Sequence, residues 1–374
     1  MSVTNSYERY HRQVILKKFG EAGQQKLLQA KVLVIGAGGL GCPALQYLAA
    51  AGIGHIGIVD DDVVSLTNLH RQILYTVNDI GLPKAKRAAA ILLSSNSEIR
   101  ITAYAERLTN QNALDILRNY DIIIDATDNF ASRYMINDAC VLLDKALVYG
   151  AVSQYEGQLA VFNSKKDGTN ERVNYRDLFP QPPAENEVLN CAEAGVLGVL
   201  TGIIGTMQAN EVIKLITGIG EPLITRLLTY NSLNNQVYEL DLSAKPGTRS
   251  LIPSNEEDFK RTDYQLLCGI NQEEIDYQFF DDLLVMGNVD VIDVREINEM
   301  TVIDEFPAYR IPSSQLAENL SVIRSDTVVV ICQSGKRSRL AANQLAAIFE
   351  TSKKIFSLRG GILEWKKQHA KQSV

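Results

Sequence analysis

A cysteine near the end of the chain opens a short loop whose residues favour an anionic sulfur. The loop consists of Cys332, Gln333, Ser334, Gly335, Lys336, Arg337 and Ser338. The apolar run before it, residues 327–331, predicts a buried strand, and residues 338–348 predict a helix. Backbone N–H groups, two basic side chains and a helix N-terminus would favour thiolate over thiol and make Cys332 nucleophilic. The alternative is an inert cysteine that ends a core strand.

A glycine-rich loop in the first part of the chain predicts a phosphate site. It follows the apolar run 31–35 and carries its glycines at Gly36, Gly38, Gly39 and Gly41. Such glycines allow a tight turn and bring a phosphate close to the N-terminus of the following helix. Asp60 ends the next strand, where its carboxylate could accept a hydrogen bond from a ribose hydroxyl. These features fit an NAD site as well as a site for any other nucleotide.

Basic residues and a further carboxylate near this loop favour ATP chemistry. Arg71 and Lys84 would neutralise charge that builds up on phosphates, and Asp128 could hold Mg²⁺. A dehydrogenase that transfers hydride has no need of such a set. An ion-pair lattice that caps the sheet is the structural alternative. We also expect the residues of the same motifs to line the nucleotide site, namely Thr67, Asn68, Leu69, His70 and Asn129.

The elements that must position these residues alternate between strands and helices. We expect strands at 31–35, 55–60, 99–103, 121–125 and 146–151, and helices at 39–52, 84–95, 111–118 and 132–143. This alternation predicts an α/β fold with a Rossmann-like, mostly parallel sheet and right-handed crossovers. Short strands, a polar loop at 163–190, a helix at 195–217 and strands at 225–230 and 236–242 should complete the region. A loop of that length is more often functional than idle.

The chain is long enough for two domains. Its 374 residues predict a first domain at 1–242, a linker at 243–270 and a smaller α/β domain at 271–374. The linker is expected because it contains Pro-Gly and Pro-Ser-Asn sequences and a run of charge. In the second domain we expect a helix at 272–284, a strand at 289–293, helical turns at 313–319 and a last helix after Gly360 and Gly361.

Composition limits the function classes. The net charge is −7 and no strongly basic stretch occurs, so a direct nucleic-acid role lacks electrostatic support. The five cysteines are scattered without a C-x-x-C pair, which argues against a disulfide framework and fits a reducing cytoplasm. The N-terminus lacks a signal-peptide core, and the longest uncharged run, 194–210, is too short to cross a membrane.

The combined motifs resemble the MoeB/ThiF family of adenylyltransferases, the smaller relatives of ubiquitin-activating enzymes. The resemblance covers roughly residues 7–242 and rests on the glycine loop, Asp60, Arg71, Lys84 and Asp128, together with Tyr10-His-Arg-Gln13, Glu156-Gly-Gln158, Phe179-Pro-Gln-Pro-Pro183 and Cys191-Ala-Glu-Ala-Gly195. The second domain resembles rhodanese sulfurtransferases. Its matches are Val291-Ile-Asp-Val-Arg-Glu296, Ile311-Pro312, the Cys332 loop and Gly360-Gly361 before Trp365. The whole chain is thus similar to fusions that activate and sulfurate small ubiquitin-like carrier proteins.

This resemblance implies a reaction and a role for each residue. A carrier protein that ends in Gly-Gly would attack the α-phosphorus of ATP and form an acyl-adenylate and pyrophosphate. Gly39, Asp60, Asn68, Arg71 and Lys84 would bind ATP, and Asp128 with Asn129 would lie beside Mg²⁺. Arg12 would reach across a homodimer to the partner's phosphates. For His70 and His11 we expect packing or surface roles.

Two cysteines would then take part in the second half-reaction, the transfer of sulfur to the carrier. The resemblance implies that Cys332 accepts sulfane sulfur from a donor such as a cysteine desulfurase and attacks the activated carbonyl as a persulfide. Cys191 matches the family cysteine that forms a thioester or disulfide with the intermediate, and its alternative role is a buried cysteine ahead of a helix. The carrier could belong to molybdopterin, thiamine thiazole or tRNA-thiolation chemistry.

One departure from the family concerns zinc. Many members bind a structural zinc through two C-x-x-C pairs, but Asn174-Tyr-Arg-Asp177 stands in the place of the first pair and no second pair follows Leu242. Asn and Asp are poor substitutes for thiolates, so we expect no zinc and a loop held by packing, with Pro182 and Pro183 as candidates. Two other functions remain open, an NAD-dependent oxidoreductase and a non-catalytic adaptor that docks the carrier.

Overall fold

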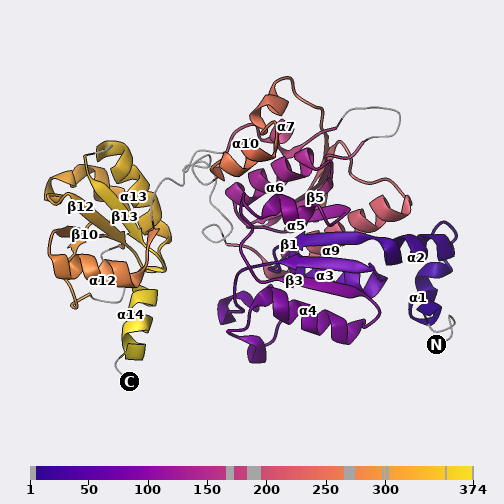
Figure 1. The fold of residues 1–374 in the computed structure, drawn as a ribbon, viewed down its shortest axis with the longest axis horizontal. Coiled ribbons are helices and arrows are strands. Elements are labelled where there is room, and N and C mark those ends of the chain that lie inside the picture. Colours follow the sequence, from indigo (N-terminus) through magenta and orange to yellow (C-terminus); the bar gives the residue numbers. More distant parts are fainter. Residues whose placement is uncertain are drawn as a thin grey trace. The chain divides into compact units, whose positions relative to one another are not determined.

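The computed structural model describes residues 6–165, 172–182, 195–264, 274–296, 299, 303–349 and 352–372. The chain divides into two compact units, Met1–Tyr264 and Gln265–Val374, which are described separately below (Figure 1). Both units are α/β, as the sequence predicted. No helix among the described residues is long and apolar enough to span a membrane.

Unit 1 is built on a mixed, mostly parallel sheet. Its strand order is β3-β2-β1-β4-β5-β6-β7-β8. The pairs from β3 to β5 are parallel, and those from β5 to β8 are antiparallel. The strands are β1 (Lys31–Ile35), β2 (His55–Val59), β3 (Arg100–Tyr104), β4 (Ile122–Asp125), β5 (Ala146–Ser153), β6 (Glu156–Phe162), β7 (Arg226–Asn231) and β8 (Gln236–Asp241).

Helices flank this sheet. The helices are α1 (Ser6–Val14), α2 (Gly20–Gln29), α3 (Gly41–Ala51), α4 (Lys84–Ser95), α5 (Ala113–Leu117), α6 (Phe130–Leu142), α7 (Tyr175–Leu178), α9 (Gly198–Thr217) and α10 (Glu256–Arg261). Helices α2, α3 and α9 pack together, and α3 also contacts α4; α6 forms a separate group with α5, α7 and α10. Short 3-10 turns are η2 (Leu66–Asn68), η3 (Val77–Asp79) and η4 (Thr248–Leu251).

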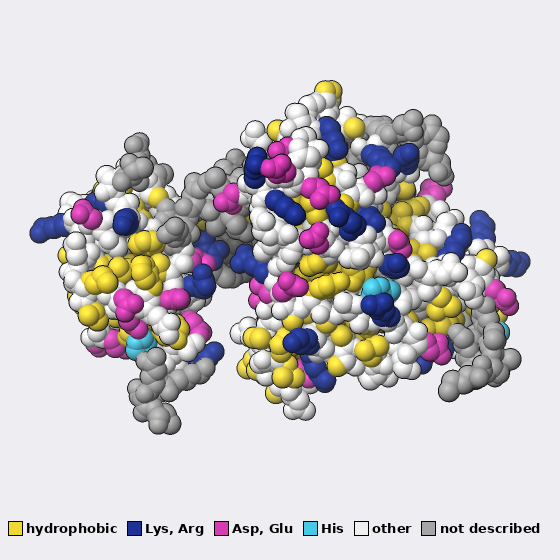
Figure 2. Space-filling model, in the orientation of Figure 1, with side chains coloured by type: hydrophobic (Ala, Val, Ile, Leu, Met, Phe, Trp, Pro, Cys, Tyr) yellow, Lys and Arg dark blue, Asp and Glu magenta, His cyan; other side chains and the backbone are white. Residues whose placement is uncertain are grey.

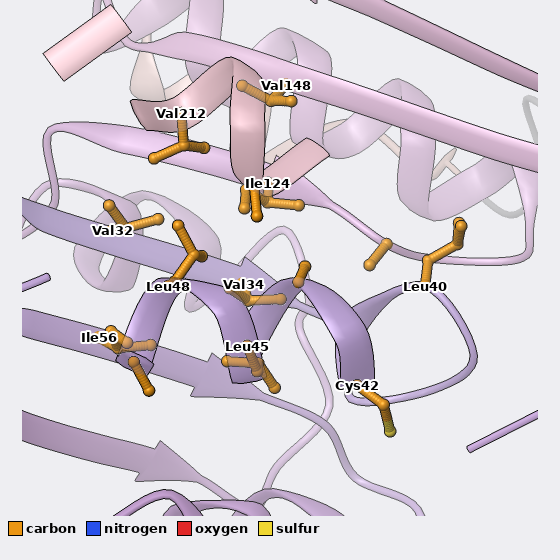
Figure 3. Close-up of a cluster of buried hydrophobic side chains, with 14 of the residues drawn as sticks. Val32, Val34, Leu40, Cys42, Leu45, Leu48, Ile56, Ile124, Val148 and Val212 are labelled. Carbon is orange, nitrogen blue, oxygen red and sulfur yellow. The ribbon is translucent and has the colours of Figure 1, made fainter. Parts of the chain in front are cut away.

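The main core lies between the sheet and α3. Figure 3 shows Leu45 and Leu48 of α3 beside Val32 and Val34 of β1, and all four side chains are fully buried. Burial on this scale contributes about 1.5–3 kcal/mol for each such side chain. The core therefore holds the start of α3, and with it the glycine loop, against the carboxyl end of β1.

Residues 243–264 belong to unit 1, although the sequence led us to expect a linker from 243 to 270. Thr248 is 6% exposed, and Phe259 and Tyr264 are at most 5% exposed. Helix α10 contacts α6, and η4 contacts α7. These buried contacts explain why the two units divide after Tyr264 rather than near Leu242.

Unit 2 has an all-parallel sheet of five strands in the order β11-β10-β12-β13-β9. Helix α13 covers one face with Ala342 and Leu345, and Phe280 of α12 and Trp365 of α14 lie in the core on the other face. The strands are β9 (Glu274–Ile275), β10 (Val289–Asp293), β11 (Tyr309–Arg310), β12 (Thr327–Ile331) and β13 (Lys354–Leu358). The helical elements are α12 (Tyr277–Met286), η5 (Ser313–Glu318), η6 (Leu320–Val322), α13 (Lys336–Phe349) and α14 (Gly361–Gln372).

Candidate active site

The glycine loop has two positions at which a side chain cannot fit. A Cβ at Gly41 would lie 1.9 Å from the carbonyl oxygen of Gly36, and a Cβ at Gly36, whose φ is +96°, would lie 2.7 Å from the carbonyl oxygen of Ala126. At Gly38 the nearest atom would be 3.6 Å away. Gly36 and Gly41 therefore serve the turn itself, whereas Gly38 leaves the approach to the loop open.

A chain of hydrogen bonds connects the glycine loop to Lys84 through two carboxylates. Asp60 accepts from the N–H of Ala37 at 2.7 Å and from the N–H of Asp62 at 2.9 Å. The Asp62 carboxylate in turn accepts from Lys84 Nζ at 2.9 Å. Burial raises the pKa of Asp60, and nearby Lys84 opposes this shift. Each Asp60 oxygen keeps acceptor capacity for a ribose hydroxyl.

The Arg71 side chain folds back on its own segment. Its guanidinium donates to Asn68 Oδ1 at 3.1 Å and to the carbonyl oxygen of Thr67 at 3.3 Å, and it lies 2.8 Å from His70 Nε2. Among the described residues, no carboxylate forms an ion pair with Arg71, so its charge is not neutralised within this part of the chain. Leu69 packs against the hydrophobic core and so holds the segment that carries Arg71 in place.

Asp128 and Asn129 are exposed at the start of α6, directly after β4. Asn129 caps the helix by accepting from the N–H of Ser132 at 2.9 Å. Asp125, by contrast, is fully buried and accepts from the N–H and the hydroxyl of Thr127. Burial raises the pKa of Asp125, so the exposed Asp128 is the better ligand for a cation.

These groups gather at the carboxyl ends of three adjacent parallel strands. The glycine loop follows β1, Asp60 follows β2, and Asp128 follows β4. The chain runs from β1 outward to β2 and β3, then returns to add β4 on the other side of β1. Such a reversal creates the crevice in which open α/β sheets bind nucleotides.

Two site residues escaped the sequence analysis. Asp62 follows Asp60 in an acidic run and shows its role only through its contact with Lys84. Gln72 is buried, its Oε1 has no hydrogen-bond partner among the described residues, and its Nε2 faces Gly38. The sequence feature that could have identified Gln72 is its polar side chain directly after Arg71. An unpaired buried oxygen beside an open loop suits a ligand with donor groups, such as a nucleotide.

The Cys332 loop lies at the carboxyl end of β12 and against the start of α14. Cys332 is 1% exposed, and its carbonyl oxygen accepts from the N–H of Ile362 at 2.9 Å. A Cβ at Gly361 would lie 2.4 Å from that oxygen, which explains the glycine pair before α14. Within the described part of the chain, the N–H groups of Gln333, Ser334 and Gly335 have no hydrogen-bond partner. They can stabilise negative charge on sulfur.

Two guanidinium groups border this loop, and each pairs with a carboxylate. Arg295 binds Asp293 through Nε at 2.9 Å and Nη2 at 2.7 Å, and Arg337 binds Glu299 through both terminal nitrogens. The Arg337 pair holds the pKa of Glu299 down to about 2. Ser338 closes the loop through its hydroxyl, which donates to the carbonyl oxygen of Gly335 at 3.0 Å. The Lys336 side chain lies outside the described residues.

Cys191 and Pro183 also lie outside the described residues, so their predicted roles stay predictions. Arg12 is exposed on α1. That helix is anchored at the far end of α3, where Tyr10 Oη accepts from Asn96 Nδ2 at 2.8 Å and Gln13 donates to the carbonyl oxygen of Ala51 at 3.2 Å.

Comparison with known proteins identifies both units. Residues 10–250 match the family described as the ThiF family, and residues 277–368 match the Rhodanese-like domain. The chain belongs to the ThiF family. It is an adenylyltransferase that also carries a sulfurtransferase domain.

Two relatives align with almost the whole chain, and a third aligns with 70% of it. The protein named adenylyltransferase and sulfurtransferase MOCS3 from Culex quinquefasciatus is 41% identical over 370 residues, which cover 92% of this chain and 83% of the relative. The probable adenylyltransferase/sulfurtransferase MoeZ from Mycobacterium tuberculosis is 40% identical over 375 residues, covering 96% of this chain and 93% of that protein. The sulfur carrier protein adenylyltransferase from Thermus thermophilus is 47% identical over 264 residues, covering 70% of this chain and 97% of that protein.

Solved structures agree on the fold of unit 1. The crystal structure of E. coli MccB superposes with a TM-score of 0.56 at 22% identity, covering 66% of this chain and 72% of that chain. A structure described as E. coli MccB with ATP gives a TM-score of 0.52 at 23% identity, covering 61% of this chain and 67% of that chain.

Proposed function

We propose that this chain adenylylates the C-terminal glycine of a small ubiquitin-like sulfur-carrier protein that ends in Gly-Gly, and then replaces the adenylate with sulfur from Cys332. One observation carries the proposal. An open phosphate loop with Arg71 and Lys84 near it, and a cysteine loop with unpaired N–H groups, occur on the same chain. A relative of this chain is named a sulfur carrier protein adenylyltransferase.

In the first half-reaction, the chain must let an anion attack a polyanion. A carboxylate is a poor nucleophile toward ATP until cations cancel the repulsion and fix in-line geometry. Arg71 and Lys84 supply two such cations, Asp60 orients the ribose, and Gly38 leaves room for the phosphates. Mg²⁺ bound by Asp128 beside Asn129 would neutralise further phosphate charge. Loss of one cation should lower the rate by about 10²–10³.

In the second half-reaction, sulfur moves from Cys332 to the carrier. The thiolate of Cys332 attacks the sulfane sulfur of a donor persulfide, such as that of a cysteine desulfurase, and the donor leaves as a thiolate. The new persulfide attacks the acyl-adenylate and AMP leaves. The Cys191 thiolate then attacks Cys332 Sγ in the acyl persulfide, so a Cys191–Cys332 disulfide forms and the thiocarboxylate leaves; a thiol reductant regenerates both cysteines. If Cys191 instead displaces AMP first as a thioester, the persulfide displaces Cys191 and gives the same acyl persulfide. The amides of Gln333, Ser334 and Gly335 hold the anionic persulfide.

The wider setting of the reaction is also part of the proposal. The protein works as a cytoplasmic homodimer in which Arg12 serves the partner's site. We assign adenylylation to residues 1–242 and sulfur transfer to residues 271–374, while residues 243–264 fold as part of unit 1. We propose no direct binding to nucleic acid, because acidic and basic side chains are interspersed on the face in Figure 2. The metabolic pathway can be that of molybdopterin, thiamine thiazole or tRNA thiolation.

We also propose that the chain carries no structural zinc. Asn174 and Asp177 stand where the resemblance places the first C-x-x-C pair. Both are buried and hydrogen bonded to each other, with Asn174 Nδ2 donating to Asp177 Oδ2 at 2.7 Å. The amide nitrogen offers no lone pair to a metal, the Asn174 Oδ1 already accepts from the N–H of Arg176 at 3.0 Å, and a closed zinc site prefers thiolate or imidazole.

One experiment separates this function from its alternatives. Each candidate carrier is incubated with the protein, Mg-ATP and a sulfur donor, and the product mass is read; a thiocarboxylate adds roughly 16 mass units because sulfur replaces oxygen. Cys332→Ala should keep carrier-dependent ATP–pyrophosphate exchange and lose the mass shift. NAD binding without exchange would support an oxidoreductase, and carrier binding without exchange would support an adaptor.

A further inference from the structure

Six buried polar side chains form a cluster where helix α6 and two further segments of unit 1 meet. We name this cluster the polar clip. Each member is at most 7% exposed. One segment leads toward Cys191, and the other ends at Tyr264, the last residue of unit 1. The members are Asp138, Asn174, Arg176, Asp177, Thr248 and Tyr264.

The carboxylate of Asp177 makes the first connection in the clip. Its Oδ2 accepts from the N–H and from the Nδ2 of Asn174, at 2.8 and 2.7 Å. Its Oδ1 accepts from the N–H of Lys245 at 2.9 Å and from the Thr248 hydroxyl. One side chain therefore ties the start of α7 to a segment 68 to 71 positions further along the chain.

The carboxylate of Asp138 makes the second connection. It accepts from Arg176 Nε at 2.9 Å and Nη2 at 2.7 Å, and from the Tyr264 hydroxyl at 3.0 Å. The Arg176 guanidinium also lies over the Tyr134 ring, 4.9 Å from its centre. Burial raises the pKa of Asp138, and the bonds from Arg176 oppose this shift. The clip thus joins α6, α7 and the end of unit 1.

The donor groups of the clip do not suit zinc. Asn174 and Asp177 are three residues apart, and so are Lys245 and Thr248, which is the spacing of two C-x-x-C pairs. However, the groups of Asn174 and Lys245 that meet Asp177 are N–H donors. A metal would have to displace these hydrogen bonds and would gain one carboxylate and one hydroxyl, whereas closed zinc sites use four thiolate or imidazole ligands.

We propose that the polar clip takes the structural role of the zinc site found in many members of this family, and that it joins the two segments without a metal. The inference depends on the proposed function in one respect, because it treats the chain as an active member of the family. Each partner in the clip is buried, so removing one leaves others unsatisfied and weakens the whole cluster. The clip also fixes Tyr264, where the segment leading into unit 2 begins.

Metal analysis of the full-length protein tests the first half of this inference. We expect less than about 0.1 zinc per chain, and the same thermal midpoint with and without a strong chelator. One zinc per chain, or a midpoint that falls with chelator, overturns the proposal. Carrier-dependent ATP–pyrophosphate exchange is measured on the same sample. If exchange is absent while the zinc content and the thermal midpoint are as expected, the proposed function is contradicted and the inference about the clip is not.

Substitutions test the second half. Thr248→Val keeps the side-chain shape and removes the hydroxyl, so the midpoint should fall by about 2–4 °C; Asp177→Ala should lower it by more than about 5 °C or prevent folding. The matched control is Thr217→Val, because Thr217 is also buried but its hydroxyl donates within its own helix, to Ile213. Equal midpoints for Thr248→Val and Thr217→Val would overturn the role of the clip.

A gain of metal binding gives an independent test. The combined substitution Asn174→Cys, Asp177→Cys, Lys245→Cys and Thr248→Cys places two C-x-x-C pairs at the clip. We expect this variant to bind one zinc, and its midpoint to fall on chelation. A variant that folds but takes up no zinc would show that these positions do not correspond to the zinc site.

Discussion

Lys84 Nζ lies 2.9 Å from Asp62 Oδ2, and this ion pair joins a buried cation to an exposed carboxylate. The Lys84 side chain is 4% exposed and that of Asp62 is 71% exposed. The N–H of Lys84 also donates to the carbonyl oxygen of Asp62, at 2.9 Å. Two contacts between the same residues therefore fix both the backbone and the ammonium group at the start of α4. Asp62 positions the cation that the proposed reaction needs.

Asp62→Asn should impair adenylation without harming the fold. The substitution keeps the shape but removes the charge that holds the ammonium, so we expect kcat for ATP–pyrophosphate exchange to fall about tenfold, with a smaller change in the KM for ATP. Asp62→Glu should recover part of this loss. Asp61→Asn is the control, because Asp61 is an exposed neighbour. Wild-type kinetics in Asp62→Asn would contradict a positioning role.

Two glycines of the glycine loop should have different roles: Gly41 should be needed for the turn, and Gly38 for nucleotide binding. Gly41→Ala should lower stability and abolish ATP binding, because the new Cβ would lie 1.9 Å from the carbonyl oxygen of Gly36. Gly38→Ala meets no atom closer than 3.6 Å, so the thermal midpoint should stay within about 2 °C while the KM for ATP rises. Thermal unfolding with and without Mg-ATP measures both effects. Normal nucleotide affinity in Gly38→Ala would show that phosphates do not approach this position.

Glu299 should make the stability of unit 2 depend on pH in the acid range. Its pairing with Arg337 lowers its pKa from 4.5 to about 2. Because the pKa is lower in the folded state, the pair stabilises unit 2 fully above about pH 4.5, and this stabilisation is lost as the pH falls through about 2. The pair is partly exposed, so its contribution should be about 0.5–1 kcal/mol.

Glu299→Gln tests this response. Hydrogen exchange of unit 2 in the full-length protein should speed up at neutral pH, and the difference from wild type should shrink as the pH falls from about 4.5 toward 2. Glu274→Gln is a suitable control, because Glu274 pairs with Arg339 on the same helix, α13. A difference from wild type that stays constant down to pH 2 would argue against the ion pair as its cause.

Sequence patterns predicted the elements that have strong periodicity. The central strands β1, β2 and β4 lie within a residue of their expected limits because continuous apolar runs mark buried parallel strands. The two-residue strands β9 and β11 were missed because they are too short to show a pattern, and β13 was missed because its burial is uneven. Helix α13 begins at Lys336 rather than Ser338, directly after the positive φ of Gly335.

Local sequence marks the motif residues of the candidate site, but it does not mark the residues that contact them. Asp60, Arg71 and Lys84 are marked by local sequence, whereas Asp62 is identified only by the contact it makes across 22 positions. The same holds for Asp177 and Thr248, which are 71 positions apart and carry no shared signal. Long-range hydrogen bonds depend on how the elements pack, so they become visible only in the folded chain.

The anchoring of α1 leads to a prediction about Arg12. Tyr10 packs against Gly52 at the end of α3, where a Cβ on the glycine would lie 2.6 Å from the tyrosine ring. The glycine loop lies at the other end of α3, a helix of 11 residues that spans about 16 Å. Arg12 lies on the helix that is anchored at the far end of α3, away from the loop of its own subunit, so we expect it to act in the site of a second subunit.

Mixed dimers can test this arrangement. Arg12→Ala and Lys84→Ala should each reduce ATP–pyrophosphate exchange by about 10²–10³ as homodimers. After the two variants are mixed and allowed to exchange subunits, each mixed dimer has one intact site, which combines Lys84 of one chain with Arg12 of the other. Random mixing should restore about a quarter of wild-type exchange. Recovery should fail when both variants carry Arg12→Ala. If the mixture stays as inactive as its parents while the dimers exchange, Arg12 acts within its own subunit or has no role in catalysis.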